Sequence, residues 1–357
     1  MSSVLDDPAA LAAADPHGAR AVLAAFPAQC RAAIDILPER LPTLKRPRVV
    51  VIAGMGGSAA AGDLVAACAA ERFEIPVVVH RGYGLPSVAW DDALVLAVSY
   101  SGDSAEVLSA VETARARRLP LVAVTSGGAL GTLASQRGLP CARVPGGVMP
   151  RMALGSLFFP IARILRALDL DVVGTDEIAE ALAVTAALGS ELAPGRPTAA
   201  NEAKRLAVAI GARWLAVYGG PVTGAAAYRW KTDFEENAKT FALAGALPEM
   251  NHNTIEAWRA PLARDLYLVL LRDAGEAPEI RRRFTLLQEL VADAAGGVAE
   301  CWTRGRGVLA RLLSLMYLGQ WTSYYQAVVR GVDPWSVPRL DEMKRRLRDA
   351  EEHRRDR

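Results

Sequence analysis

The stretch VVVIAGMGGSAAAGDL, residues 49–64, decides the fold class of this chain. Its first four residues are apolar and β-branched, which is typical of a strand buried on both faces of a parallel sheet. Glycines follow this run directly, and an alanine-rich segment that favours a helix follows the glycines. The stretch therefore predicts a strand, a tight turn and a helix, which is the repeating unit of α/β proteins.

The alternation of strands and helices continues through the first half of the chain. Apolar runs bounded by turn residues predict further strands at residues 76–80, 93–99, 121–126 and 141–144. When parallel strands are joined by helices, the helices cover both faces of the sheet. We therefore expect a doubly wound parallel sheet in this half.

A second copy of the pattern follows the linker APGRP at 193–197. The run WLAVYGGPVTGAAAYRW at 214–230 again places a strand before glycines and a helix, so an internal duplication is indicated. We expect an α/β fold of two doubly wound, flavodoxin-like domains with a C-terminal helix. The predicted boundaries are 1–192 for the first domain, 193–337 for the second and 338–357 for a highly charged helix.

The composition limits the classes of protein to which this chain can belong. Its 357 residues suffice for two domains, and 52% hydrophobic residues exclude a disordered chain. A net charge of +2 gives no support for a nucleic-acid or anionic-membrane partner. The acidic N-terminal segment lacks a signal-peptide pattern, and no 18-residue stretch is free of polar breaks. We therefore expect a cytoplasmic protein without a membrane span.

The four cysteines lie far apart in the sequence, at Cys30, Cys68, Cys141 and Cys301. No CxxC pair and no cysteine–histidine spacing of a metal site is present. We therefore expect isolated reduced thiols in or near the core, with no metal ion and no cofactor.

Two glycine- and serine-rich turns follow predicted strands and open predicted helices. The first is GMGGS at 54–58 and the second is SYSGDS at 99–104. Glycines let the backbone approach a ligand, helix N-termini offer unpaired N–H groups, and hydroxyls donate to phosphate oxygens. Because the carboxyl ends of parallel strands share one edge of a sheet, the two turns predict a common phosphate site.

Two other interpretations of these turns compete with the phosphate site. A dinucleotide site is not favoured, because the GxGxxG spacing is missing and no acidic residue ends the strand at 76–80. The serines of the second turn have a simpler interpretation, in which they only close the turn and Ser104 caps the next helix. The presence of GMGGS one strand–helix unit earlier favours the phosphate site.

Six segments, in their order and spacing, make the chain resemble the sugar-isomerase (SIS) domain family, and within it the bifunctional phosphoglucose/phosphomannose isomerases. The segments are GMGGSAAAGDL (54–64), SYSGDS (99–104), PRMALG (150–155), EENAK (235–239), PEMNHN (248–253) and GVDP (331–334) followed by Lys344. The resemblance covers nearly the whole chain. It implies an isomerase that interconverts glucose 6-phosphate or mannose 6-phosphate with fructose 6-phosphate through an enediolate, without a metal.

An aldose–ketose isomerase needs a base that moves a proton between C2 and C1, a group that opens the sugar ring, and a donor that stabilises the enediolate. Glu235 and Glu236 point about 100° apart on a helix, so only one can face the site. The match to EENAK selects Glu236 as the base. His252 lies in the polar loop PEMNHN and would open the ring, because histidine exchanges protons near neutral pH.

Two basic residues complete the catalytic set that the resemblance implies. Arg151 begins a long apolar helix, where a cation opposes the helix dipole, and it would stabilise the enediolate. Lys344 is the only lysine of the arginine-rich C-terminal helix and would assist ring opening, although a solvated basic helix is an alternative. The residues expected to bind the substrate phosphate are Gly57, Ser58, Ser99, Ser101 and Ser104.

Two positions depart from the pattern of the family. Asp103-Ser104 stands where Asn-Thr is common, which keeps the hydroxyl but adds a negative charge near the phosphate. Trp335 is bulky where relatives often carry smaller residues. The sequence therefore leaves open which of the two epimers, glucose or mannose 6-phosphate, is preferred.

Two alternative functions stay open at this point. A non-catalytic SIS module would bind a sugar phosphate in a regulatory role, but such modules usually lack the glutamate, histidine and lysine set. An amidotransferase-type isomerase half would need a partner domain that is not in this sequence.

We also expect a homodimer with shared active sites. About a dozen residues separate the helix of Glu236 from His252, which is long for a compact α/β unit. In the family that the chain resembles, the equivalent histidine reaches into the pocket of the neighbouring subunit, and a two-fold interface would let both subunits exchange this segment. The other expected partner is the small-molecule sugar phosphate.

Overall fold

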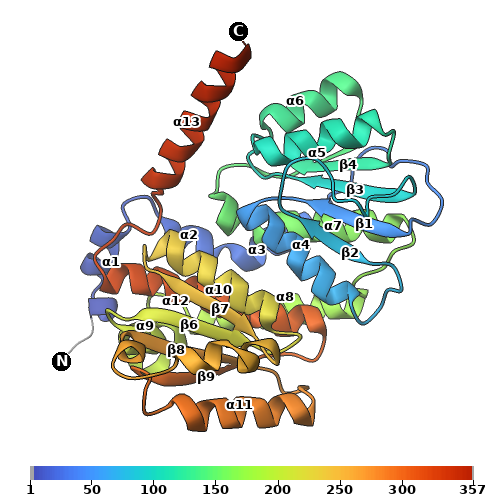
Figure 1. Cartoon of the computed structure of the whole chain (residues 1–357). Helices are drawn as coiled ribbons and strands as arrows, with labels where there is room; N and C mark the ends of the chain where they lie inside the picture. The colour runs from blue at the N-terminus through green and yellow to red at the C-terminus, as the bar shows by residue number, and fades with distance from the viewer. Residues whose placement is uncertain (1–3, 356–357) are drawn as a thin grey trace.

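Each half of the chain forms a parallel β-sheet flanked by helices (Figure 1). The computed structural model describes residues 4–355, without the side chains at 348 and 350–355. The first sheet has the order β2-β1-β3-β4-β5 and consists of β1 (Val49–Ala53), β2 (Val77–His80), β3 (Ala93–Val98), β4 (Leu121–Thr125) and β5 (Cys141–Arg143). All neighbouring strands in it run parallel.

The second sheet repeats the arrangement of the first. It has the order β7-β6-β8-β9 and consists of β6 (Trp214–Gly219), β7 (Ala242–Ala246), β8 (Leu266–Arg272) and β9 (Val298–Trp302), again all parallel. In chain order, the first four strands of both sheets follow the pattern 2-1-3-4, as in flavodoxin-like folds. The predicted fold class, two duplicated doubly wound domains, is confirmed.

Strand β7 was not predicted from the sequence. We expected only a long connecting segment between the helix of Glu236 and His252, whereas Ala242–Ala246 pairs with β6 as an edge strand. Its residues ALAGA include no β-branched or aromatic side chain, so local propensity gives no strand signal. The strand forms because β6 offers it a free edge, and the irregular part of the connection is correspondingly short.

Helices cover both faces of the first sheet. Those on one face are α4 (Gly56–Ala69) and α7 (Leu154–Ala167), and those on the other are α5 (Ala105–Ala116) and α6 (Gly128–Arg137). The side chains of β3 show the alternation that produces this arrangement, because Leu94 and Leu96 pack toward α4 and α7 while Val95 and Ala97 pack toward α5 and α6.

The second sheet is covered in the same way. The helices on one face are α9 (Glu202–Ile210), α10 (Gly224–Asn237) and α12 (Val308–Val329), and α11 (Pro278–Val291) covers the other. Leu215 and Val217 face α12, whereas Ala216 and Tyr218 face α11.

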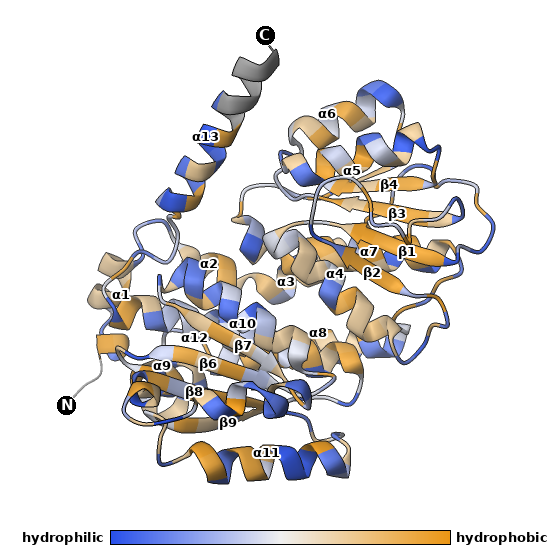
Figure 2. Cartoon of the chain, in the orientation of Figure 1, coloured by the Kyte–Doolittle hydropathy of each residue, from blue (hydrophilic) through white to orange (hydrophobic). Residues whose placement is uncertain are grey.

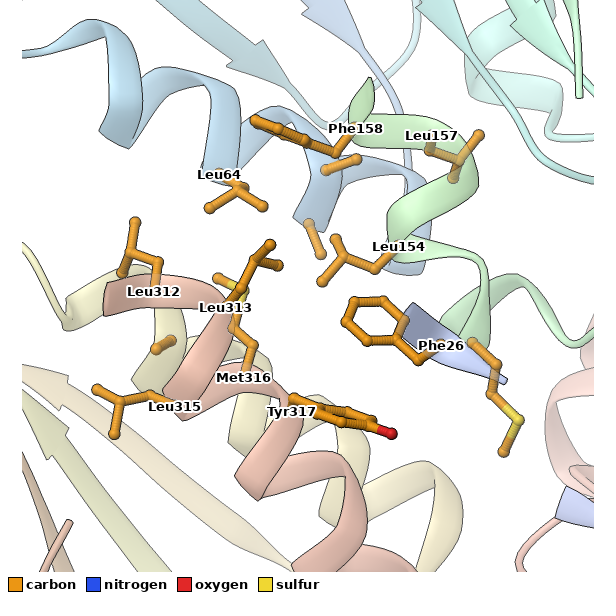
Figure 3. Close-up of a cluster of buried hydrophobic side chains, with 14 of the residues drawn as sticks. Phe26, Leu64, Leu154, Leu157, Phe158, Leu312, Leu313, Leu315, Met316 and Tyr317 are labelled. Atoms are coloured by element: carbon orange, nitrogen blue, oxygen red, sulfur yellow. The ribbon is translucent and has the colours of Figure 1, made fainter. Parts of the chain in front are cut away.

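One continuous hydrophobic core joins the two halves, and α12 lies at its centre. Figure 3 shows Leu313, Met316 and Tyr317 of α12 beside Leu64 of α4 and Leu154 of α7. Almost every residue of α12 is buried, since helices from both halves surround it. The two domains are therefore packed as one body around this helix.

The remaining helices extend this packing. The segments against α12 are η1 (Val4–Asp6), α1 (Pro8–Ala14), α2 (Ala19–Ala24) and α8 (Thr175–Glu191), and α3 (Phe26–Ala33) packs on α7 and α8. The short 3-10 helices are η2 (Pro150–Met152), η3 (Thr198–Ala200), η4 (Glu249–His252), η5 (Thr254–Ala257) and η6 (Leu262–Asp265). The last helix, α13 (Pro338–Arg355), is mostly hydrophilic and projects from the body (Figure 2).

Two expectations about the whole chain can be checked directly. All four cysteines are unpaired; Cys30, Cys68 and Cys301 are buried and Cys141 is partly so, as expected for reduced thiols in or near the core. In the part of the chain that the structure describes, no helix combines the length and apolarity needed to cross a membrane.

The start of α4 lies directly against η2. A Cβ atom at Gly57 would lie 2.5 Å from the carbonyl oxygen of Pro150 and 2.9 Å from the Cα atom of Arg151. Real Cβ contacts are longer than this, so only glycine allows the two backbones to approach so closely. Gly57 therefore sets the distance between the turn after β1 and Arg151.

We expect Gly57→Ala to lower the free energy of unfolding by about 1–3 kcal/mol, the usual cost of overpacking, because the new methyl group overlaps backbone atoms. Urea denaturation measures this loss. Gly146→Ala is the control, because its Cβ would meet no atom closer than 3.8 Å. Equal unfolding midpoints for the two variants would show that the contact between α4 and η2 is not tight.

Candidate active site

The two predicted phosphate-binding turns lie side by side at the carboxyl ends of β1 and β3, which are neighbouring strands. The backbone N–H of Tyr100 in the second turn donates to Oγ of Ser58 in the first, over 3.1 Å. The hydroxyls of Ser99 and Ser104 lie 3.0 Å apart. The structure thus brings together the serines that the sequence predicted for one site, and we call residues 56–58 and 99–104 the serine cradle.

The serines of the second turn have different local tasks. Oγ of Ser99 accepts the N–H of Gly102 over 3.1 Å, and Oγ of Ser101 accepts the N–H of Asp103 over 3.3 Å, so both help to close the turn. Ser104 stands at the N-cap position of α5, but its side chain makes no capping hydrogen bond. The expectation that Ser104 is the N-cap residue of this helix is confirmed, although its hydroxyl lies beside that of Ser99 and makes no capping bond.

The negative charge of Asp103 is directed away from the cradle. Its Oδ1 accepts the N–H of Ala129, in the first turn of α6, over 2.9 Å. A carboxylate at a helix N-terminus is favoured by the helix dipole. Asp103 thus has a partner of its own, and the charge that departs from the family pattern is bound at α6.

Tyr100 connects the cradle to the segment that carries Arg151. Its hydroxyl donates to the carbonyl of Pro145 over 3.0 Å and accepts the N–H of Val148 over 3.3 Å. This loop leads directly into η2, where Arg151 lies. Together with the close contact at Gly57, these bonds hold Arg151 at the edge of the cradle.

The guanidinium of Arg151 is the most highly connected group of the site. It donates to Oδ1 of Asn237 (2.7 Å), to Oε2 of Glu236 (3.3 Å) and to the carbonyls of Pro334 (2.9 Å) and Trp335 (2.6 Å). Its side chain is 2% exposed, whereas that of Glu236 is 29% exposed. Burial lowers the pKa of Arg151, and the charge of Glu236 opposes this shift. The predicted base and the predicted cation therefore form an ion pair beside the serine cradle.

A second charged pair lies beneath Arg151, inside the protein. The guanidinium of Arg229 donates to the carbonyl of Arg151 and lies 2.8 Å from Oδ1 of Asp233. Both side chains are almost fully buried. Burial raises the pKa of Asp233 to about 7, although the neighbouring charge of Arg229 lowers it. This pair holds the backbone at Arg151 from inside the protein, and no sequence motif marked it.

The loop of residues 333–335 closes the other side of Arg151. Lys239 donates to the carbonyl of Asp333 in this loop and to the carbonyl of Asn237 over 3.2 Å. His17 reaches the same loop, with Nδ1 3.2 Å from Oδ2 of Asp333 and its ring stacked 6.3 Å from that of Trp335. We name residues 333–335 the arginine loop.

Sequence reasoning missed several of these neighbours. Asn237 and Lys239 belong to the EENAK segment, so the motif marked them without assigning a task. His17 had no local signal, because its partner Asp333 lies near the other end of the chain. The two residues meet because the N-terminal helices pack on α12.

Two predicted site residues are not joined to the others within the chain. His252 lies at the end of η4 and is exposed, and its side chain makes no hydrogen bond or ion pair with any residue that the structure describes. Lys344 lies on helix α13, which projects from the body (Figure 1), and its side chain is exposed. Within the described part of the chain it makes no polar contact with Arg151 or Glu236.

The corresponding turns of the second domain carry different residues from the serine cradle. They line a cavity of about 180 Å³ that includes Thr223, Asp273 and Glu276. The carboxylate of Asp273 pairs with Arg311 over 2.6 Å, and that of Glu276 pairs with Arg272. Carboxylates repel an anion, and these two stand in the described turns of the second domain where the first domain has serine hydroxyls. Among the side chains that the structure describes, no group of three or more His, Cys, Asp or Glu residues is placed to hold a metal ion.

Two family models match the chain. The SIS domain model matches residues 43–136, and the model of the bacterial phospho-glucose isomerase C-terminal SIS domain matches residues 199–347. The first range contains the serine cradle, and the second contains Glu236, His252 and Lys344.

Individual relatives extend over most of the chain. The bifunctional phosphoglucose/phosphomannose isomerase of Caldicellulosiruptor bescii is 34% identical over 306 residues, covering 85% of this chain and 90% of that protein. Its counterpart from Thermoplasma acidophilum is 32% identical over 299 residues, covering 84% and 89%. A solved glucose-6-phosphate isomerase like protein from Thermus thermophilus shares the fold, with a TM-score of 0.61, 20% identity and coverage of 96% and 98%. The chain therefore belongs to the family of bifunctional phosphoglucose/phosphomannose isomerases, which is built from SIS domains.

Proposed function

We propose that this protein is a metal-independent isomerase that interconverts glucose 6-phosphate and mannose 6-phosphate with fructose 6-phosphate. The observation that carries the proposal is the Arg151–Glu236 ion pair at the edge of the serine cradle. A phosphate held in the cradle would place the sugar chain over this pair. The family membership of the chain supports the same chemistry.

The proposed reaction moves two protons within the open-chain sugar. Glu236 accepts the proton from C2 of the open-chain aldose and returns it to C1, while the proton of the C2 hydroxyl passes to the oxygen at C1. The enediolate that forms between these steps carries negative charge on its oxygens. The reaction neither oxidises nor reduces the sugar as a whole, so its atoms and electrons balance without a cofactor.

Arg151 is suited to stabilise that negative charge. A guanidinium has five N–H donors, and four hydrogen bonds of Arg151 go to protein acceptors. With respect to the described residues, the second N–H of Nη1 stays available for a substrate oxygen. Because the surrounding bonds hold the group in place before the substrate arrives, little reorganisation is needed as charge develops.

We further propose that the working enzyme is a homodimer in which His252 acts in the site of the other subunit. His252 is exposed and follows edge strand β7 directly. Large apolar side chains near this strand are also exposed, with Phe241 72%, Trp214 50% and Leu243 48% accessible. A second copy of the chain that covered them would bury this apolar surface and bring His252 to a neighbouring site.

The base assignment predicts the behaviour of Glu236→Gln. The amide keeps the size of the side chain but cannot accept the proton, so turnover of glucose 6-phosphate should fall by at least roughly a hundredfold. A coupled assay of fructose 6-phosphate formation measures this. Glu235→Gln is the control, since Glu235 pairs with Lys231 over 2.7 Å rather than with Arg151. Near-normal turnover of Glu236→Gln would exclude Glu236 as the base.

The cradle assignment predicts a loss of phosphate affinity when Ser99 and Ser101 are replaced by alanine. Each lost hydrogen bond to a charged group costs about 1.5–3 kcal/mol, so KM should rise by about tenfold or more per serine. Steady-state kinetics measure the change, with Ser190→Ala on the exposed face of α8 as control. Inorganic phosphate should raise the Tm of the wild type, and an equal rise in the double variant would place the phosphate elsewhere.

The shared-site assignment predicts that two inactive variants restore activity when mixed. His252→Ala and Glu236→Gln chains that exchange subunits at random form about half heterodimers, each with one intact site and one doubly damaged site. About a quarter of the wild-type activity should therefore return. Sedimentation of an active monomer, or an exchanged mixture without activity, would place His252 in the site of its own chain.

A further inference from the structure

Lys239 occupies an unusual place in the backbone. It follows the C-cap residue of α10, Ala238, and has a φ of +52°. This is the position at which helices commonly end with glycine, because other residues rarely adopt the left-handed conformation. Among the residues that the structure describes, only Arg118 and Asp169 share this feature with Lys239 outside glycine. A side chain retained at such a position points to a task that glycine could not perform.

The ammonium group of Lys239 joins two segments of the site. It donates to the carbonyl of Asn237 at the end of α10 and to the carbonyl of Asp333 in the arginine loop. Asn237 and the arginine loop are the same two elements that accept hydrogen bonds from Arg151. Lys239 thus bridges the elements on both sides of the Arg151 guanidinium.

We propose that Lys239 is a positioning residue that holds the arginine loop against α10 and thereby fixes the direction of the Arg151 guanidinium toward Glu236. Without the bridge, the carbonyls of Pro334 and Trp335 lose one of their supports, and Arg151 can turn with them. This inference rests on the proposed isomerase function, because it assigns Lys239 a part in the same site.

The charge of Lys239 makes the bridge sensitive to pH. The residue as a whole is exposed, but partial burial of its ammonium, together with the positive charge of Arg151, lowers its pKa to about 8. The charged groups that face it are Arg151 from η2, Glu236 from α10 and Asp333 from the arginine loop, which itself pairs with His17. Hydrogen bonds from an ammonium are stronger than those from a neutral amine, so the bridge weakens as the pH rises through about 8.

The test compares Lys239→Met, Lys239→Arg and the control Lys231→Met. Lys231 lies on α10, and its ion-pair partner in the described part of the chain is Glu235, not a residue of the arginine loop. A displacement of about 1 Å can cost up to about a hundredfold in rate, so kcat of Lys239→Met should fall by about ten- to a hundredfold, with KM changed less. Lys239→Arg keeps the donors and stays charged, so its activity should persist above pH 8, where that of the wild type declines.

Hydrogen–deuterium exchange gives a readout that does not depend on activity. Amides in residues 331–337 should exchange faster in Lys239→Met than in the wild type or in Lys231→Met. A fall in kcat without faster exchange would overturn the proposal, because Lys239 would then act on the substrate and not on the loop. The proposal would also be overturned if kcat of Lys239→Met and the decline of activity above pH 8 were the same as in the wild type. If the wild type is inactive on all three sugar phosphates, the proposed function is refuted. The hydrogen–deuterium exchange of residues 331–337 then still tests whether Lys239 holds the arginine loop.

Discussion

The burial of one guanidinium, that of Arg151, constrains how the two halves of this protein meet. A buried charge is stable only when its hydrogen-bonding groups are satisfied, and removal of a partner from such a group costs roughly 3–5 kcal/mol. The acceptors of Arg151 come from α10 and from the arginine loop, whereas Arg151 itself precedes α7 of the first domain. These three segments must therefore keep their places together.

Backbone contacts also connect the segment of Arg151 to the serine cradle. Gly57 lets α4 lie against η2, and Tyr100 binds the loop before η2 through Pro145 and Val148. The hydrophobic core around α12 supports all of these contacts, because it continues from one half into the other (Figure 3). The cradle, the guanidinium and the carboxylate of Glu236 thus belong to one rigid arrangement, which suits chemistry that requires a fixed geometry.

The two domains share a topology but contribute different residues to the proposed site. The first domain carries serine hydroxyls at the carboxyl ends of β1 and β3, where no carboxylate would repel the proposed phosphate. In the second domain, Asp273 and Glu276 occupy the comparable turns and pair with arginines of their own. That domain contributes Glu236 from the helix after its first strand instead. Two sheets of the same topology thus carry different side chains at their carboxyl ends.

The amino-acid sequence by itself determined the elements whose signal is local. Apolar β-branched runs ending in glycines predicted β1 and its turn, and the serine turns and EENAK marked the cradle and Glu236. Strand β7 had no such signal, because alanine and glycine reveal no preference until β6 offers an edge. Only the tertiary structure decided that Arg151 contacts Glu236 and the arginine loop, and that Lys239 and His17 lie beside them. Arg151 and Trp335, for example, are 184 residues apart in the sequence. A contact between residues so far apart produces no periodic pattern or motif from which it could be predicted.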